Sequence, residues 1–135
     1  MKELTVEATI GNIPAVTDFV DEELETLGCS PRIQAQINIA IDELFSNIAH
    51  YAYNPSTGPA TVQVEVEKNP LAVVVTFIDR GKRYDPLSAR EPDLSLDLAQ
   101  RPVGGLGIFL VRKTMDNVSY EYRDGRNILR IKKQI

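Results

Sequence analysis

The sequence predicts an α+β fold, a two-layer sandwich in which helices cover one face of an antiparallel or mixed sheet. Two long segments, residues 13–27 and 31–53, have the apolar spacing of amphipathic helices. Five shorter segments either alternate apolar and polar residues or are apolar throughout, as strands do. Two pairs of these short segments flank turn signals, and strands joined by hairpins pair antiparallel.

The first strand is predicted from an alternation in which every second residue is apolar: Leu4, Val6, Ala8 and Ile10. The first helix follows from Ile13 and stops at Gly28, a residue that favours helix ends. Ser30-Pro31 opens the second helix, with serine as the N-cap and proline in the first turn. This helix is expected to run to about Tyr53, because Asn54-Pro55 marks a turn.

The next two strands form a predicted hairpin. Val62, Val64 and Val66 alternate with polar residues, which indicates a strand with one wet face. The segment 71–78 is nearly all apolar, so it is expected to be a central, buried strand. Asn69-Pro70 joins the two.

The remaining elements follow a long polar segment, residues 79–103, with three prolines and only weak helical patterning. Residues 108–115 form a predicted helix that begins at a glycine cluster. Residues 118–122 and 128–131 flank Asp124-Gly125, a strong signal for a hairpin.

Composition narrows the class of protein. A chain of 135 residues fits one domain, 1–135, and its net charge of −4 argues against sequence-independent binding of nucleic acid. One cysteine and one histidine argue against an internal disulfide and a structural zinc site. No apolar run approaches the roughly 20 residues of a membrane span. The N-terminus lacks the pattern of a secretory signal, so a cytoplasmic location without membrane partners is expected.

The second helix carries the first candidate site. Its apolar face is expected to pack on the sheet: Ile37, Ile41, Leu44, Ile48 and Ala52. Glu43, Asn47 and His50 fall on a second stripe, about 130° away. A carboxylate and a carboxamide one turn apart suit a metal-bound phosphate, with Asn47 offering an oxygen to Mg²⁺. The alternative is an ordinary polar helix face.

The second candidate is Asp79-Arg80-Gly81, at the end of the apolar strand. An aspartate there can accept a hydrogen bond from an exocyclic amine such as that of adenine. Gly81 would let the backbone pass close to a flat ring. The alternative is a strand followed by a common turn.

The third candidate is Gly104-Gly105-Leu106-Gly107, directly before the last predicted helix. Glycines permit a phosphate to approach the backbone, and a helix N-terminus presents free N–H groups. The segment is neither a Walker loop nor a dinucleotide fingerprint. The alternative is a flexible loop that ends in a cap.

In this order the three segments resemble the N, G1 and G2 boxes of the GHKL ATPases, the superfamily of histidine kinases, type II topoisomerases and Hsp90-like chaperones. The wording of residues 42–53, 79–86 and 105–116 is similar to that of the anti-sigma-factor serine/threonine kinases. The resemblance covers nearly the whole chain and implies the Bergerat ATP-binding fold, with ATP and Mg²⁺ as ligands.

The resemblance also implies a role for each matching residue. Asn47 would hold Mg²⁺, and Glu43 would be the general base toward a serine. Asp79 would read adenine, with Gly81 beside the ring. Residues 82–103 would form an ATP lid, in which Arg90 and Arg101 could reach phosphate. The phosphate-side loop would be Gly104, Gly105, Leu106 and Gly107.

The chain departs from the family at two positions. Many members have histidine where this chain has Tyr51, and His50 comes one residue early. His50 is therefore expected to be a partly buried helix histidine without a role. The family often has threonine at the adenine edge, where this chain has Asn127, which could donate a similar hydrogen bond.

The function implied is that of a protein serine kinase and anti-sigma factor. It would phosphorylate an anti-sigma-factor antagonist and sequester a sigma factor, and family members commonly form homodimers. The alternative is a binding module that uses ATP only as a structural ligand. A histidine-kinase catalytic domain fits less well, because no dimerisation helix with a phosphoacceptor histidine is present, and a topoisomerase would need a further domain.

Overall fold

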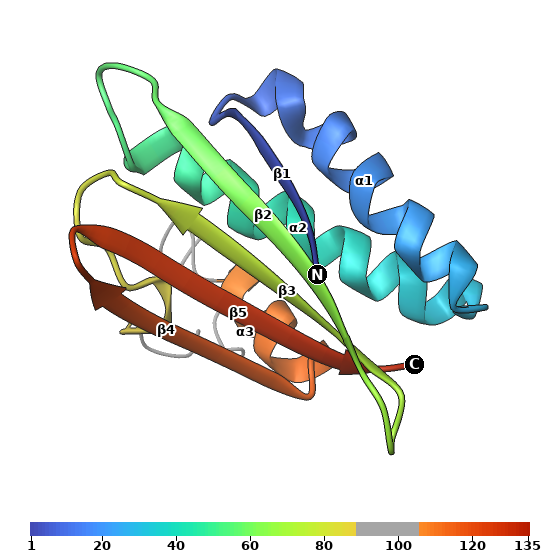
Figure 1. Ribbon diagram of the computed structural model, residues 1–135. Helices are drawn as coiled ribbons and strands as arrows, with labels where there is room; N and C mark the ends of the chain where they lie inside the picture. The colour runs from blue at the N-terminus through green and yellow to red at the C-terminus, as the bar shows by residue number, and fades with distance from the viewer. Residues whose placement is uncertain (89–105) are drawn as a thin grey trace.

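The computed structural model describes residues 1–88 and 106–135 and has two layers, a twisted sheet and a layer of helices behind it (Figure 1). All three labelled helices lie on the same face of the sheet. The elements are β1 (Lys2–Glu7), α1 (Ile13–Thr26), α2 (Pro31–Tyr51), β2 (Pro59–Glu67), β3 (Ala72–Asp79), α3 (Leu106–Thr114), β4 (Asn117–Arg123) and β5 (Arg126–Gln134).

The sheet has the strand order β1-β2-β3-β5-β4, and every neighbouring pair is antiparallel. The predicted α+β sandwich is confirmed, and of the two predicted sheet types the antiparallel one is present. Strand β3 is in the middle, as its apolar sequence predicted, and six of its eight residues are buried. Because β3 pairs with β5, the end of β3 at Asp79 lies directly opposite Asn127.

The core lies between the sheet and the helices. Strands β2 and β3 contribute Val62, Val75 and Phe77, and helix α1 contributes Leu24; each is almost fully buried. Of its predicted apolar face, helix α2 buries Ile37, Ile41 and Leu44, while Ile48 is partly buried; it also buries Phe45, a side chain that the predicted face did not include. Phe45 is buried because α2 packs against both α1 and α3. The buried part of the α2 surface is therefore wider than packing on the sheet alone would require.

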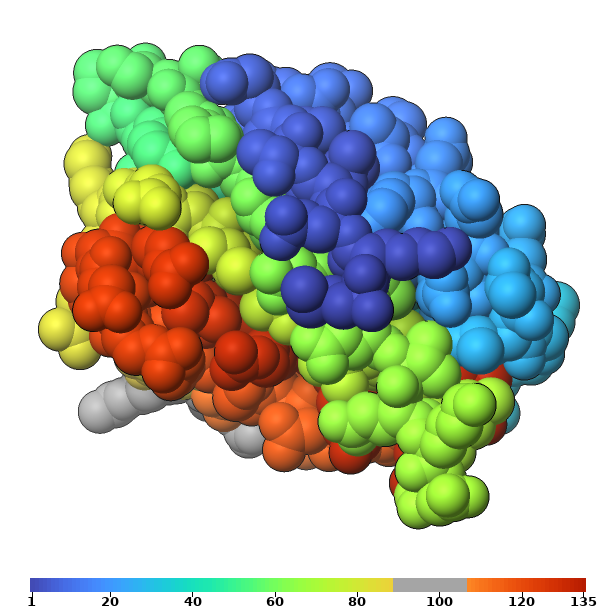
Figure 2. Space-filling model, in the orientation of Figure 1, coloured from blue at the N-terminus to red at the C-terminus, as the bar shows by residue number. Residues whose placement is uncertain are grey.

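The other face of the sheet is turned to the viewer in Figure 2, where β1, β2 and β5 cross the molecular surface. Polar side chains link β1 and β2 there. The hydroxyls of Thr5 and Thr61 lie 2.8 Å apart, and Gln63 donates a 2.8 Å hydrogen bond to Glu3. This is the wet face that the alternation in β2 predicted. In the described ranges, 1–88 and 106–135, no helix has the length and apolar character that crossing a bilayer requires.

Three element ends can be compared with prediction. Ser30 caps α2 as predicted: its Oγ accepts a 3.3 Å hydrogen bond from the N–H of Ile33. Helix α2 ends at Tyr51, somewhat before the predicted Tyr53. Strand β1 ends at Glu7, and the prediction that Ile10 belongs to this strand was wrong. The carbonyl of Glu7 accepts from the N–H of Thr9, which turns the chain into a 3₁₀ turn and leaves Ile10 47% exposed.

Both predicted hairpins are present. The β4–β5 turn has two central residues, Asp124 and Gly125, with φ angles of 55° and 75°. Two positive φ angles are the mark of a type I′ turn, whose twist matches that of the strands. The Asp-Gly signal is therefore confirmed. This hairpin sets the register of β4 against β5, whereas the pairing of β5 with β3 places Asn127 opposite Asp79.

Candidate functional site

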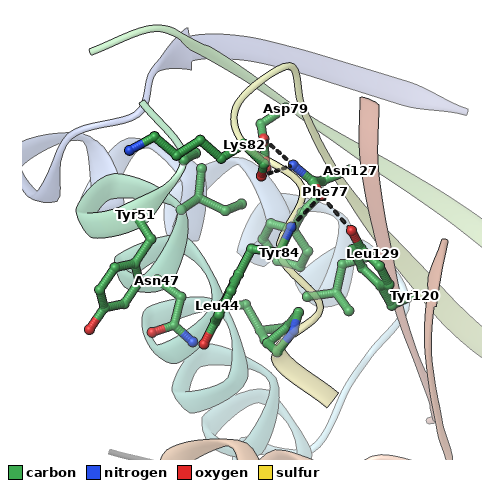
Figure 3. A pocket seen from close by; sticks show the side chains of 13 residues that line it. Leu44, Asn47, Tyr51, Phe77, Asp79, Lys82, Tyr84, Tyr120, Asn127 and Leu129 are labelled. Atoms are coloured by element: carbon green, nitrogen blue, oxygen red, sulfur yellow. Dashed lines mark hydrogen bonds between the residues drawn. The ribbon is translucent and has the colours of Figure 1, made fainter. Parts of the chain in front are cut away.

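A pocket lies between the C-terminal half of α2 and the ends of β3 and β5, beneath the loop that follows β3 (Figure 3). It encloses about 410 Å³, part of which is open to solvent. Its lining is mostly apolar and aromatic, with a few polar groups: Leu44, Asn47, Ile48, Tyr51, Ala52, Phe77, Asp79, Lys82, Tyr84, Pro86, Tyr120, Asn127 and Leu129.

Asp79 is the buried acid of this pocket, with only 5% of its surface exposed. Its Oδ1 accepts two hydrogen bonds of 2.9 Å, from the backbone N–H of Gly81 and from Nδ2 of Asn127. Burial raises the pKa of the Asp79 carboxyl, and these two hydrogen bonds oppose the increase because they favour the charged form. The side chain is thus a fixed hydrogen-bond acceptor at the apolar end of the pocket.

The structure gives a reason for glycine at position 81 that the sequence did not reveal. A Cβ added to Gly81 would collide with the backbone carbonyl group of Ala52, at the end of α2. The next residue, Lys82, donates its backbone N–H to that same carbonyl at 2.8 Å. The absence of a side chain at Gly81 therefore lets the loop pack on the end of α2; its predicted place beside a ring stays a prediction.

Asn127 lies in the pocket, as its place near the last hairpin suggested, but its bonding differs from the prediction. Its Nδ2 donates to Oδ1 of Asp79 and to the backbone carbonyl of Lys82. The amide has only two N–H bonds, and both are used within the protein. The expected hydrogen bond from Asn127 to a base is therefore not available in this structure.

Two of the predicted motifs meet beside Asn47, which lines the pocket. Glu43 faces the first turn of α3, where a Cβ added to Gly107 would collide with the Glu43 carboxylate. Nδ2 of Asn47 donates a long, 3.5 Å hydrogen bond to Oε1 of Glu43. Both side chains are half-buried. Residues far apart in the sequence, on α2 and α3, thus meet at one place, as the resemblance implied.

The chemistry of these donors fits a phosphate-bound metal better than a metal held by the protein alone. Among the residues that the structure describes, no three His, Cys, Asp or Glu side chains gather as a metal site. Mg²⁺ in nucleotide sites takes one or two oxygen ligands from the protein and the rest from phosphates and water. With its Nδ2 turned to Glu43, Asn47 has a side-chain oxygen available for such a role.

Two tyrosines stand at the mouth of the pocket. The rings of Tyr51 and Tyr84 are 5.7 Å apart, and both side chains are about half exposed. Figure 3 shows Tyr84 extending from the loop after β3 toward Asn47 on α2. Burial raises the pKa of Tyr84, and the negative charge of Glu43 contributes to the increase. His50 is exposed, so its predicted partial burial was wrong; its ring lies 6.1 Å from that of Tyr51 on the outer side of α2.

Several predicted residues lie outside the described residues. Gly104, Gly105, Arg90 and Arg101 are among them, as is the predicted lid beyond Ser88. The backbone of Leu106 begins α3. The start of the predicted lid is described: Pro86 is buried against the pocket, and Nη2 of Arg112 on α3 donates a 2.7 Å hydrogen bond to the carbonyl of Leu87.

Sequence reasoning missed two tyrosines that support the site. The hydroxyl of Tyr53 accepts a 2.8 Å hydrogen bond from the N–H of Arg80 and donates to the carbonyl of Pro59 at 2.6 Å, which ties the segment after α2 to the start of β2 and to the residue that follows β3. Tyr120 lines the pocket and donates to Oδ1 of Asn127. The alternation of β4 contained the signal for Tyr120, since it shares a face with the inward-pointing Val118.

Comparison with known proteins gives a consistent result. Residues 6–133 match the family model of the histidine kinase-like ATPase domain. The serine/threonine-protein kinase BtrW of Bordetella bronchiseptica is 33% identical over 100 residues, which cover 74% of this chain and 70% of BtrW. The serine-protein kinase RsbW of Bacillus cereus strain AH820 is 28% identical over 100 residues, which cover 71% of this chain and 61% of RsbW.

A solved structure supports the fold. The crystal structure of the RsbU and RsbW domains of Rv1364c from Mycobacterium tuberculosis superposes with a TM-score of 0.68 and 18% identity. The match covers 99% of this chain and 32% of that chain. The resemblance inferred from the three motifs is confirmed by the family match, and nearly the whole described sheet and helix layer lies within it. The chain belongs to the histidine kinase-like ATPase domain family.

Proposed function

We propose that the pocket binds Mg-ATP and that the chain is a serine protein kinase, with adenine at Asp79 and the phosphates at Asn47 and Glu43. One observation carries the proposal: one pocket is lined by the buried carboxylate of Asp79 and by Asn47, whose amide donates a hydrogen bond to the carboxylate of Glu43. The similarity to relatives named serine-protein kinases supports it.

At the base end, the pocket offers apolar walls and one charged acceptor. The apolar walls include Phe77, Leu129 and Ile48. A planar base that packs against them would bury its apolar surface away from water. The Asp79 carboxylate would accept a hydrogen bond from the exocyclic amine of adenine. A base with an oxygen at that position would instead place two acceptors face to face, at a cost of unpaired buried groups.

At the phosphate end, the chain offers a neutral oxygen and a helix N-terminus. The side-chain oxygen of Asn47 would hold Mg²⁺, whose charge offsets that of the phosphates when it is bound. The first turn of α3, at Gly107, would present its N–H groups to phosphate oxygens. We assign Gly104, Gly105 and Leu106 to the same phosphate-side loop.

Glu43 is the proposed general base. It would accept the proton from the hydroxyl of a protein serine while the serine oxygen attacks the γ-phosphorus and ADP leaves. Its carboxylate lies between α2 and the N-terminus of α3, next to the place proposed for the phosphates. The position of Glu43 supports catalysis, whereas a module that uses ATP only as a structural ligand would have no need of this carboxylate.

The proposed substrate is an anti-sigma-factor antagonist, and the proposed second partner is a sigma factor in the cytoplasm. A phosphate added to the antagonist serine would introduce a dianionic group at its interface and release the antagonist. The chain would then be free to hold the sigma factor. We propose that residues 1–135 act as one such domain and that it forms a homodimer.

A labelling experiment tests the proposal. The protein is incubated with Mg-ATP and candidate antagonist proteins, and phosphoserine is measured together with ATP affinity. Glu43→Gln should reduce labelling by at least about 100-fold with little change in ATP affinity. Asn47→Ala should weaken Mg-ATP binding by about 10-fold or more. Asp42→Asn is the matched control, because it neutralises the neighbouring carboxylate on the exposed side of α2.

Two results would contradict the proposal. If the wild-type protein binds ATP tightly but labels no antagonist, the kinase assignment fails and the structural-ligand alternative gains. If Glu43→Gln and Asn47→Ala lose ATP affinity equally, the division of roles between base and metal ligand is wrong.

A further inference from the structure

We propose that Asn127 is a positioning residue that gives the pocket its selectivity for adenine through Asp79, rather than a direct ligand of the base. The inference rests on the proposed function, since it assumes that Asp79 reads a nucleobase. It is carried by the hydrogen bonds around the Asn127 side chain, which Figure 3 shows as dashed lines.

Asn127 is held at the site by the register of the sheet. It lies on β5 directly opposite Asp79 on β3, and only 6% of its surface is exposed. Residues directly opposite each other in an antiparallel pair project to the same face. The two side chains therefore share one wall of the pocket.

Every hydrogen-bonding position of the Asn127 amide is used within the protein. Its N–H groups donate to Oδ1 of Asp79 at 2.9 Å and to the carbonyl of Lys82 at 2.8 Å. Its oxygen accepts from the N–H of Tyr84 at 3.1 Å and from the hydroxyl of Tyr120 at 2.5 Å. Two donors and two lone pairs exhaust the amide. No group of Asn127 remains for a ligand.

The hydrogen bond from Asn127 would affect a ligand through the carboxylate of Asp79. Its Oδ1 accepts from Gly81 and Asn127, while within residues 1–88 and 106–135 none of its hydrogen bonds uses Oδ2. The carboxylate is thus fixed by one oxygen and offers the other as a single acceptor. Such a group favours a base that donates at this point and disfavours one that presents a carbonyl oxygen.

The hydrogen bond from Asn127 also favours the charged form of Asp79. Burial raises the pKa of Asp79, and the hydrogen bond from Asn127 is the larger of the two influences that lower it. Without that bond the pKa of Asp79 would rise further. On acidification Asp79 would then become protonated at a higher pH and would lose the carboxylate that an amine donor needs. A protonated carboxyl could itself donate to a carbonyl oxygen, and selectivity would fall.

The other titratable or charged groups near this wall do not reproduce that effect. Burial raises the pKa values of Tyr53, Tyr84 and Tyr120, so these phenols stay neutral in the acidic range. Arg80 and Lys82 lie on the loop after β3. The carboxylates of Asp85 and Glu43 contribute to the raised pKa of Tyr84. Asp79→Asn, measured in parallel, removes the contribution of Asp79 and leaves these groups in place.

The test measures affinity for ATP and for purine riboside 5′-triphosphate, which lacks the exocyclic amine, by calorimetry with Mg²⁺ from about pH 5 to about pH 8. In the wild-type protein ATP should bind about 10-fold more tightly than the analogue. Asn127→Ala should bring this ratio near one, and the loss of ATP affinity on acidification should begin at higher pH. Asn127→Ser, which keeps a polar group but removes the amide, is the second variant should the alanine protein not fold.

A purely structural role predicts a different result. If the variants weaken ATP and the analogue by the same factor and the pH profile is unchanged, the inference is overturned while the proposed function stands. If the wild-type protein binds neither nucleotide, or binds both equally, the assignment of Asp79 in the proposed function fails, and the inference fails with it.

Discussion

Two glycines of the site show how the same residue type serves different purposes. The Cβ missing from Gly107 leaves room for the Glu43 carboxylate, the far end of a flexible side chain. The Cβ missing from Gly81 leaves room for the backbone of Ala52, which is fixed in the last turn of α2. A side chain can move aside at little cost, whereas a packed backbone cannot. Substitution should therefore affect activity at Gly107 and stability at Gly81.

Gly107→Ala should lower phosphotransfer to an antagonist by about 100-fold, because a displaced Glu43 would no longer lie in line with the reacting serine. The free energy of unfolding should stay the same or increase by about 0.5 kcal/mol, since alanine is the better helix former. Single-turnover kinetics and urea unfolding measure the two quantities. Gly11→Ala is the control, because its Cβ would meet no atom within 4 Å. Unchanged kinetics would contradict the placement of Glu43.

Gly81→Ala should lower the free energy of unfolding by about 1–3 kcal/mol, because the loop would have to move away from Ala52. The hydrogen bond from Lys82 N–H to the Ala52 carbonyl would be strained by the same movement. Urea unfolding followed by circular dichroism measures the change, again beside Gly11→Ala. A Gly81→Ala protein as stable as the control would show that the loop does not depend on this close approach.

At the scale of elements, α2 does most to build the site, because one face packs in the core while Glu43 projects toward α3 and Asn47 lines the pocket. Its start depends on a local signal. Ser30 accepts a hydrogen bond from the N–H of Ile33, and Pro31 occupies the first turn. Such caps act within four residues, so they are readable from the sequence alone.

Ser30→Ala should lower the free energy of unfolding by about 1 kcal/mol, because one N–H of the first turn would lose its partner. Ser30→Asp is the matched control, since aspartate caps as well as serine and also favours the positive end of the helix dipole. Chemical denaturation of the three proteins measures the difference. An equal loss in both variants would mean that the hydroxyl does not act as a cap.

Local sequence signals predicted most helices, strands and turns. The features that were not predicted depend on contacts outside those local patterns. The Asp124-Gly125 turn and the Ser30 cap depend on neighbouring residues only, and both are confirmed. The end of β1 depends on the turn at Glu7, so the alternation up to Ile10 was misleading. The partners of Asn127 come from β3, β4 and the loop between β3 and α3, and no local pattern contains them.

At the scale of the whole molecule, the sheet order explains how three separate motifs make one pocket. Strand β3 is central and ends at Asp79, β5 beside it supplies Asn127, and α2 crosses behind them with Asn47 facing inward. Helix α3 packs against α2 and brings Gly107 to Glu43. The motif resemblance could predict which residues meet, but their hydrogen bonds depend on this packing.

We propose that ATP lies in this pocket with its base at Asp79 and its phosphates near Asn47 and Glu43. An NMR titration of the ¹⁵N-labelled chain with Mg-ATP tests it most directly, because each backbone and side-chain amide reports on its own surroundings. We expect the largest chemical-shift changes at Gly81, Gly107 and the side-chain amides of Asn47 and Asn127, with α1 and β1 unaffected. Shifts centred on α1 and β1, or none at saturating Mg-ATP, would contradict it.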